Sequence, residues 1–121
     1  MEIETRQGEQ LARYLNLATS EIKLTAANMA NIDTPGYRAV GLDFEAEMRE
    51  SLKDLDEGDQ NPRPVRVRAV DGLISRPDGN DVSMDREGLN LAEAQLKFKV
   101  GVTLLRSKHQ LLMDAIHADN K

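Results

Sequence analysis

Few residues in this sequence have the types and spacing needed for chemistry. The 121 residues include no Cys, which excludes a thiolate nucleophile, a disulfide and a zinc–thiolate site. The two histidines, His109 and His117, would lie about 12 Å apart along one helix, too far to share a metal ion. No serine lies in a nucleophile elbow, and the glycines form no phosphate-binding loop. We therefore expect a protein that is not an enzyme and that uses no metal or cofactor.

The acidic stretch 78–85 has a faint likeness to a calcium-binding loop. An EF-hand needs Asp or Asn at the fifth position of the loop, Gly at the sixth and Glu at the twelfth. These positions hold Val82, Ser83 and Leu89 here, so all three fail. Residues 78–80 are better interpreted as a turn.

The charge balance excludes several classes of partner. A net charge of −5 and a pI of about 5.0 argue against nucleic acid and against an anionic membrane surface. The densest basic stretch, Arg63, Arg66 and Arg68, follows a run of acidic residues and is expected to be a solvated face. No apolar run approaches the roughly 20 residues that span a bilayer. The charged first ten residues predict no cleavable signal peptide.

Hydrophobic periodicity predicts a long helix over residues 8–32. Apolar or small residues recur there in alternating steps of four and three, which is typical of a heptad pattern: Leu11, Leu15, Ala18, Ile22, Thr25, Met29 and Ile32. Pro35 should end the helix, because proline disfavours the helical conformation of the residue before it. Pro35 and Gly36 fit a type II turn, with Gly36 at positive φ.

The middle of the chain, residues 33–85, is expected to be an irregular insert. Residues 42–58 carry a partial apolar stripe that suits a short helix. Two extended runs flank Asp71–Gly72, which makes residues 65–76 a candidate β-hairpin with a type I′ turn. An isolated hairpin is marginal in water, so this one should need a partner surface.

A second long helix is expected over residues 86–118. It carries two neighbouring apolar seams: Leu91, Phe98, Val102, Leu105, Leu112 and Ile116, and beside them Leu89, Ala92, Leu96, Val100, Leu104, Leu111 and Ala115. Because one seam suffices for one partner helix, the second seam indicates a second partner. Gly101 weakens this helix but permits bending or close approach. The predicted fold is a single mainly α domain, 1–121, whose terminal amphipathic helices pair as a hairpin or coiled coil.

One run, residues 27–37, is more specific than a helix end and a turn. Asn28 and Asn31 are polar residues on one helix face beside the apolar pattern, and Tyr37 follows the turn directly. A polar face with an aromatic residue at a helix end suits a subunit contact.

This run resembles the N-terminal signature of the flagellar axial proteins, the family of rod, hook and hook-associated subunits. The matching residues are Asn28, Ala30, Asn31, Thr34, Pro35, Gly36 and Tyr37. The C-terminal half is similar to the proximal rod subunits of that family, through Ala94, Gln95, Leu96 and Phe98 and then Ser107, Lys108, Leu112, Ala115 and Ile116. The resemblance covers essentially the whole chain.

The resemblance implies a structural subunit of the proximal rod of the bacterial flagellar basal body. Its terminal helices would polymerise into the drive shaft and export channel through Leu11, Leu15, Ile22, Met29, Leu96, Phe98, Val102, Leu105, Leu112 and Ile116. The implied partners are other copies, other rod subunits, the MS-ring adaptor protein and the flagellar type III export apparatus, with no nucleic acid and no small-molecule substrate. The implied location is the periplasm-spanning rod, reached without a cleavable signal. The alternative is a cytosolic helical-hairpin adaptor or export chaperone, which would share the helices but would not need the signature.

Overall fold

The computed structural model describes the backbone of residues 2–119 and the side chains of residues 6–119. The elements occur in the order α1 (Glu2–Ala30), β1 (Val40–Gly41), α2 (Phe44–Asp56), β2 (Arg68–Ala69) and α3 (Met84–Asp119). The predicted mainly α fold with two long terminal helices is therefore confirmed. Both helices begin before the residues where the periodicity placed them.

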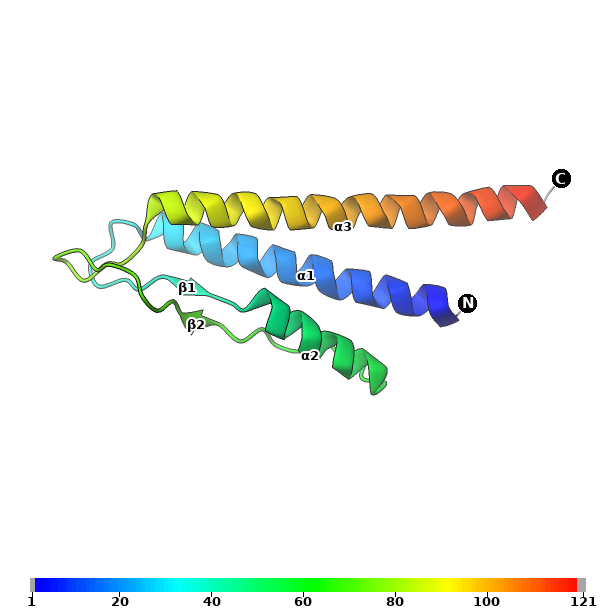
Figure 1. Ribbon diagram of the computed structural model, residues 1–121, viewed down its shortest axis with the longest axis horizontal. Coiled ribbons are helices and arrows are strands. Elements are labelled where there is room, and N and C mark those ends of the chain that lie inside the picture. Colours follow the sequence, from blue (N-terminus) through cyan, green and yellow to red (C-terminus); the bar gives the residue numbers. More distant parts are fainter. Residues whose placement is uncertain (1, 120–121) are drawn as a thin grey trace.

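The three helices lie side by side, with α1 between α3 and α2 (Figure 1). The long helices α1 and α3 are antiparallel, so the first turn of α1 and the last turn of α3 lie toward one end of the molecule, and the loops that follow α1 and precede α3 lie at the other. We call these the open end and the closed end. None of the helices in residues 2–119 combines the length and the apolar character that crossing a membrane would require.

The register of the α1–α3 pair follows from four contacts between the two helices. From the open end to the closed end, the facing residues are Gly8 with Lys108, Leu15 with Gly101, Glu21 with Lys97, and Asn28 with Glu87. As the residue numbers along α1 increase, those of the facing residues on α3 decrease. This is the order expected of an unbroken antiparallel pair.

The line of α3 that faces α1 is made of small and polar residues rather than large apolar ones. It comprises Glu87, Ala94, Gly101 and Lys108, seven residues apart, and the first three are buried. By helical geometry this line runs between the two predicted apolar seams, so neither seam forms the centre of the contact. At Gly101 the helices are so close that a Cβ atom would lie 2.5 Å from Leu15 Cδ2.

Helix α2 begins at an N-cap that the sequence supplies. The Asp43 side chain accepts a hydrogen bond from the Ala46 backbone N–H at 3.1 Å, which pairs one of the free donors of the first turn. The Phe44 ring packs edge-on against Tyr14 of α1, with centroids 5.5 Å apart. The Lys97 ammonium of α3 lies 4.1 Å from the centroid of the same ring. Phe44 thus joins all three helices.

The strands form a small antiparallel sheet, but with a different pairing from the one expected. Val40 pairs with Ala69 and Gly41 with Arg68, so β2 joins β1 rather than a strand after Asp71–Gly72. The predicted hairpin within 65–76 is wrong in its partner. The reason is that β1 is already fixed to α1 through Asn28, and it offers β2 an anchored edge that a free hairpin would lack.

The basic stretch is exposed, as the sequence predicted for a solvated face. The sequence did not predict that its three arginines pair with a row of acidic residues along α2 and at its N-cap. We call residues 63–68 the arginine strap. Its ion pairs are Arg63 with Asp54 at 2.6 Å and Glu50 at 3.6 Å, Arg66 with Glu47 at 2.8 Å, and Arg68 with Asp43 at 3.6 Å.

Candidate functional site

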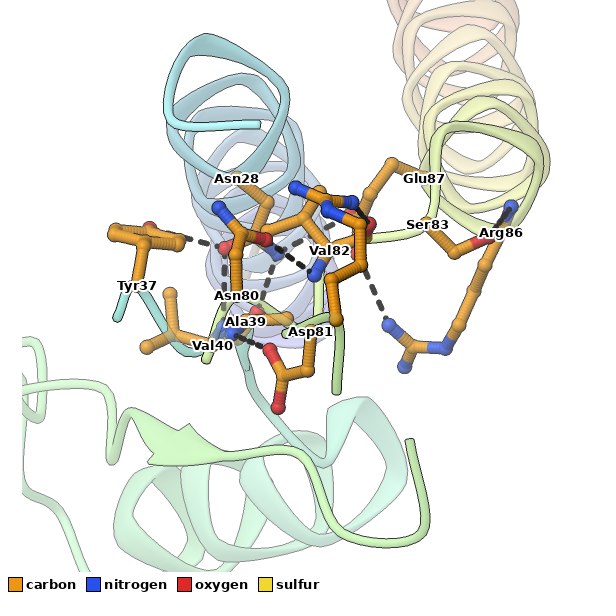
Figure 2. A network of polar contacts seen from close by, with 11 residues as sticks. Asn28, Tyr37, Ala39, Val40, Asn80, Asp81, Val82, Ser83, Arg86 and Glu87 are labelled. Atoms are coloured by element: carbon orange, nitrogen blue, oxygen red, sulfur yellow. Dashed lines mark hydrogen bonds and ion pairs between the residues drawn. The ribbon is translucent and has the colours of Figure 1, made fainter. Parts of the chain in front are cut away.

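The signature run and the loop before α3 meet at the closed end of the molecule (Figure 2). We call this cluster the closed-end junction and define it by Asn28, Tyr37, Asn80, Asp81 and Glu87. Its residues come from α1, from the two loops and from the first turn of α3. Few apolar residues are fully buried in the described chain, so polar side chains fill this part of the interior.

Asn28 lies at the centre of the junction and is only 1% exposed. Its amide nitrogen donates to the Val40 carbonyl at 2.8 Å and to Glu87 Oε2 at 3.1 Å. Its amide oxygen accepts from the Val40 N–H at 3.0 Å and from the Tyr37 hydroxyl at 3.1 Å. All four hydrogen-bonding positions of the side chain are therefore used. One residue fixes the strand β1, the tyrosine after the turn and the start of α3.

Asn80 holds the turn that follows α1 from the opposite loop. Its side-chain nitrogen lies 2.9 to 3.0 Å from the carbonyls of Asn31, Ile32 and Thr34. These residues follow Ala30, the last residue of α1, so Asn80 ties the turn to the loop that precedes α3. Arg76 donates to the Ile32 carbonyl as well and brings a positive charge to the negative end of the helix dipole.

The rest of the signature run shapes the turn that follows α1. Thr34 Oγ1 donates to Asn31 Oδ1 at 3.0 Å, and the Asn31 amide donates to the Ala27 carbonyl at 2.8 Å. Gly36 has φ of 75°, as the predicted type II turn requires, and its N–H donates to the Asp78 carbonyl at 2.9 Å. Ala30 and Pro35 are exposed.

Most polar contacts of the signature residues are thus within the chain. A role for these residues in assembly stays a prediction.

Two acidic residues of the junction had not been identified from the sequence. Asp81 accepts a hydrogen bond from the Ala39 N–H at 2.6 Å, and Arg38 lies 3.6 Å away on its other oxygen. Glu87 is fully buried and accepts from Asn28 and from Arg86. The only signal for either residue was the Asp78–Gly79–Asn80 turn, which marks a bend without showing what it contacts.

A second candidate site is the apolar surface of α3. Leu96 is 61% exposed and Leu111 70% exposed, values that are unusual for large apolar side chains. We call the following set the α3 apolar face: Leu89, Leu96, Phe98, Val100, Leu104, Leu105, Leu111, Leu112 and Ile116. Val102 is half-buried, as are Leu11, Leu15, Ile22 and Met29 on α1.

A groove opens between α1 and α3 toward the chain ends. The helices diverge there (Figure 1), and the space between them measures about 430 Å³. Its walls include Leu11 and Tyr14 of α1 and Leu104 and Leu111 of α3. The groove therefore continues the α3 apolar face and could receive an apolar side of another helix.

The remaining candidate ligands do not gather into a site. His109 and His117 are both exposed on α3. Across the described residues, no group of three His, Cys, Asp or Glu side chains is arranged to hold a metal ion. In the acidic stretch 78–85, Asn80 and Asp81 are directed to backbone groups of this chain.

Sequence comparison identifies relatives that align over most of the chain. The flagellar basal body rod protein FlgB of Salmonella typhimurium is 34% identical, over 88% of this chain and 89% of its own length. The FlgB protein of Proteus mirabilis is 30% identical, over 82% of this chain and 85% of its own. That of Escherichia coli is 27% identical, over 88% and 89%. No family model matches the chain.

Proposed function

We propose, since this chain belongs to the FlgB family of flagellar basal body rod proteins, that it polymerises through α1 and α3 to build the proximal rod. In this proposal the two terminal helices of each subunit line the export channel, and the assembled subunits transmit rotation as part of the drive shaft.

The observation that carries the proposal is the α3 apolar face. Many large apolar side chains left exposed along one helix indicate a contact with another molecule. The residues of this face cannot be covered by the helix that already lies beside α3, because α1 contacts the line through Ala94 and Gly101. Full burial of a large apolar side chain contributes about 1.5 to 3 kcal/mol. Covering the exposed part of each of these side chains contributes a fraction of that, and their sum would hold neighbouring subunits.

The two seams of α3 also favour an open assembly over a closed dimer. They lie on opposite sides of the α1 contact line, so α3 can contact one neighbour on each side. Two different surfaces that contact each other across subunits make a heterologous interface, and repetition of it by a screw operation gives a filament. A tubular rod is an assembly of this kind.

The finer parts of the proposal concern partners and route. The subunit would contact other copies of itself, other rod subunits and the MS-ring adaptor protein, and it would reach the periplasm through the flagellar type III export apparatus without signal cleavage. The closed-end junction supports assembly indirectly, because it fixes the angle between α1 and α3 before neighbours bind.

The test replaces exposed leucines of the α3 apolar face in a strain that lacks the chromosomal gene. Leu104→Ser and Leu111→Ser remove apolar surface without touching the junction. We expect rings without rods in electron micrographs of basal bodies, and loss of swimming. Ile74→Ser is the matched control, because Ile74 is 91% exposed but lies in a loop away from α3.

Circular dichroism of the purified variants should show that they keep the helical fold. Complete rods from a double Leu104→Ser and Leu111→Ser variant would refute the proposal.

A further inference from the structure

A cleft of about 390 Å³ lies on the side of the molecule where α1, the two strands and the first turns of α3 meet. Its walls come from residues far apart in the sequence, among them Glu21 and Thr25 of α1, Asp71 after β2, and Asn90 and Glu93 of α3. The cleft is separate from the groove at the open end, with which it shares no residue.

Some charged groups on the wall are already paired. Glu87 is held by Asn28 and Arg86, and Glu21 accepts from Lys97 at 3.1 Å. Arg68 lies 3.6 Å from Asp43 of the acidic row on α2. Asp71 and Glu93 differ from these groups, because neither has an ion pair or side-chain hydrogen bond to another described residue. The uncompensated charge of the cleft is therefore negative.

Thr25 supplies an independent sign that the cleft is built for a ligand. Its side chain lines the cleft and the residue is only 6% exposed, yet its hydroxyl has no hydrogen-bond partner among the described residues. Other threonines in the long helices behave differently. Thr19 and Thr103 each donate to the carbonyl four residues earlier, at 2.9 Å. The Thr25 hydroxyl is not among the buried polar atoms without a partner, so it opens to the cleft and is available to a bound polar group.

We propose that this cleft binds an arginine side chain of a partner protein. Two unpaired carboxylates, a free hydroxyl and the Asn90 amide provide several acceptors around one space. A guanidinium group has five N–H donors in a fixed plane and can engage several of them at once, whereas a lysine ammonium has three. Leu24, Leu42 and Val70 provide apolar wall against which the aliphatic stem of arginine can pack.

This surface goes beyond the polymerisation proposed above. It lies against the sheet rather than on the α3 apolar face, and it recognises a charged group rather than an apolar helix. The two surfaces can therefore be disabled separately. Substitutions at Leu104 and Leu111 that abolish rod assembly should leave the binding of a small arginine probe unchanged. Failure of the cleft to bind that probe would likewise leave the role of the α3 apolar face untouched.

The test is a titration of the full chain, labelled with ¹⁵N, with N-acetyl-arginine amide at low salt. We expect saturable amide shifts concentrated at Thr25, Asp71, Asn90 and Glu93. N-acetyl-citrulline amide, which has the same shape without the charge, is the control ligand and should cause no comparable shifts. Shifts of equal size with both ligands, or shifts spread over the surface, would overturn the proposal.

Substitutions in the cleft test which residues bind the probe. Asp71→Asn combined with Glu93→Gln should lower the affinity for N-acetyl-arginine amide by about fivefold or more, as expected for the loss of two exposed ion pairs. Thr25→Val, which preserves shape and removes the hydroxyl, should also weaken it. Glu45→Gln removes an exposed carboxylate on α2 outside the cleft and should leave the affinity unchanged. Wild-type affinity in the double variant would contradict the assignment even if the wild-type titration saturates.

Discussion

The side-chain amide of Asn28, near the end of α1, donates a hydrogen bond to the Glu87 carboxylate in the first turn of α3, 3.1 Å away and out of contact with solvent. The two residues are 59 positions apart in the sequence. Their contact closes the hairpin at one end, while the other end diverges into a groove. The angle between the long helices is thus set by polar contacts at the closed end together with the close approach at Gly101.

Asn28→Asp should destabilise the fold strongly. The change replaces the donor toward Glu87 and the Val40 carbonyl with an oxygen, and it places a second carboxylate in a buried site. Breaking a buried hydrogen bond to a charged group and leaving it unpaired costs about 3 kcal/mol or more in unfolding free energy. Urea denaturation followed by far-ultraviolet circular dichroism measures this change.

Two further variants separate the loss of the contact with Glu87 from the effect of an Asn-to-Asp change as such. Asn31→Asp makes the same chemical change where the side-chain amide has only local, exposed contacts with Ala27 and Thr34, so it should cost much less. Adding Glu87→Gln to Asn28→Asp restores a donor–acceptor pair and should recover part of the loss. Equal stability of the Asn28→Asp and Asn31→Asp proteins would contradict the role assigned to the junction.

Two glycines of α3 should respond in opposite ways to alanine. Gly88 has open space where a Cβ would be, so Gly88→Ala should raise stability by about 1 kcal/mol through helix propensity alone. At Gly101 the same atom would lie 2.5 Å from Leu15 Cδ2 and 3.1 Å from Tyr14 Cδ1. Overpacking of this kind costs about 1 to 3 kcal/mol, so Gly101→Ala should lower stability.

Thermal melting of the two variants beside the wild type tests the contrast. Leu15→Ala in the Gly101→Ala protein should relieve the clash. The substitution should therefore lower the melting temperature less in the Gly101→Ala protein than in the wild type. A Gly101→Ala protein that melts as high as Gly88→Ala would mean that the helices are not in close contact at this point.

The sequence predicts the elements of this fold better than their contacts. The periodicity of α1 and α3 and the turn at Pro35–Gly36 are local properties, and the structure contains them. The partner of β2 is not local, because it depends on β1 being held by Asn28.

The apolar pattern of α3 was a poor guide to the face that packs on α1. Periodicity reports every apolar face of a helix, including those directed away from its own chain. The contact line is identified instead by Ala94 and Gly101, because small residues allow two helices to approach closely. The contacts of the closed-end junction were harder still to predict from the sequence. Asn80 and Glu87 are separated from their partners by some 50 residues and belong to no sequence pattern.

Arg13 of α1 offers a test of what a buried charge contributes to stability. The residue is buried, Nη2 lies 3.3 Å from the Asp59 carbonyl, and Nη1 has no hydrogen-bond partner among the described residues. Because an incompletely paired buried charge is costly, Arg13→Met should leave the unfolding free energy unchanged or raise it by about 1 to 2 kcal/mol. Arg13→Ala leaves a cavity and should lower it. Equal losses in the two variants, measured by urea denaturation, would show that the guanidinium stabilises the fold.

The contact between α2 and the arginine strap should weaken in acid. The hydrogen bonds from Arg63 hold the pKa of Asp54 below its ordinary value of 3.8, despite the opposing effect of burial. In the unfolded chain the carboxyl regains the ordinary pKa, so it takes up a proton at a higher pH than in the folded chain. The stabilisation by this pair is therefore fully present above that value and is lost as the pH falls through the lower, folded pKa.

Comparison of the wild type with Asp54→Asn over a range of pH isolates this pair. The wild type should be the more stable protein near neutral pH. The difference in unfolding free energy should shrink steadily below about pH 4, because the unfolded wild-type chain takes up a proton at Asp54 first and the folded chain follows at a lower pH. Glu45→Gln, on the same helix but without an ion pair, should follow the wild-type pH dependence. A difference between wild type and Asp54→Asn that stays constant into acid would mean that the carboxylate charge contributes nothing and that the strap is held by its other contacts. Since Arg66 and Arg68 are mostly exposed, that outcome would leave Glu47, which is buried beside Arg66, as the main anchor of the strap.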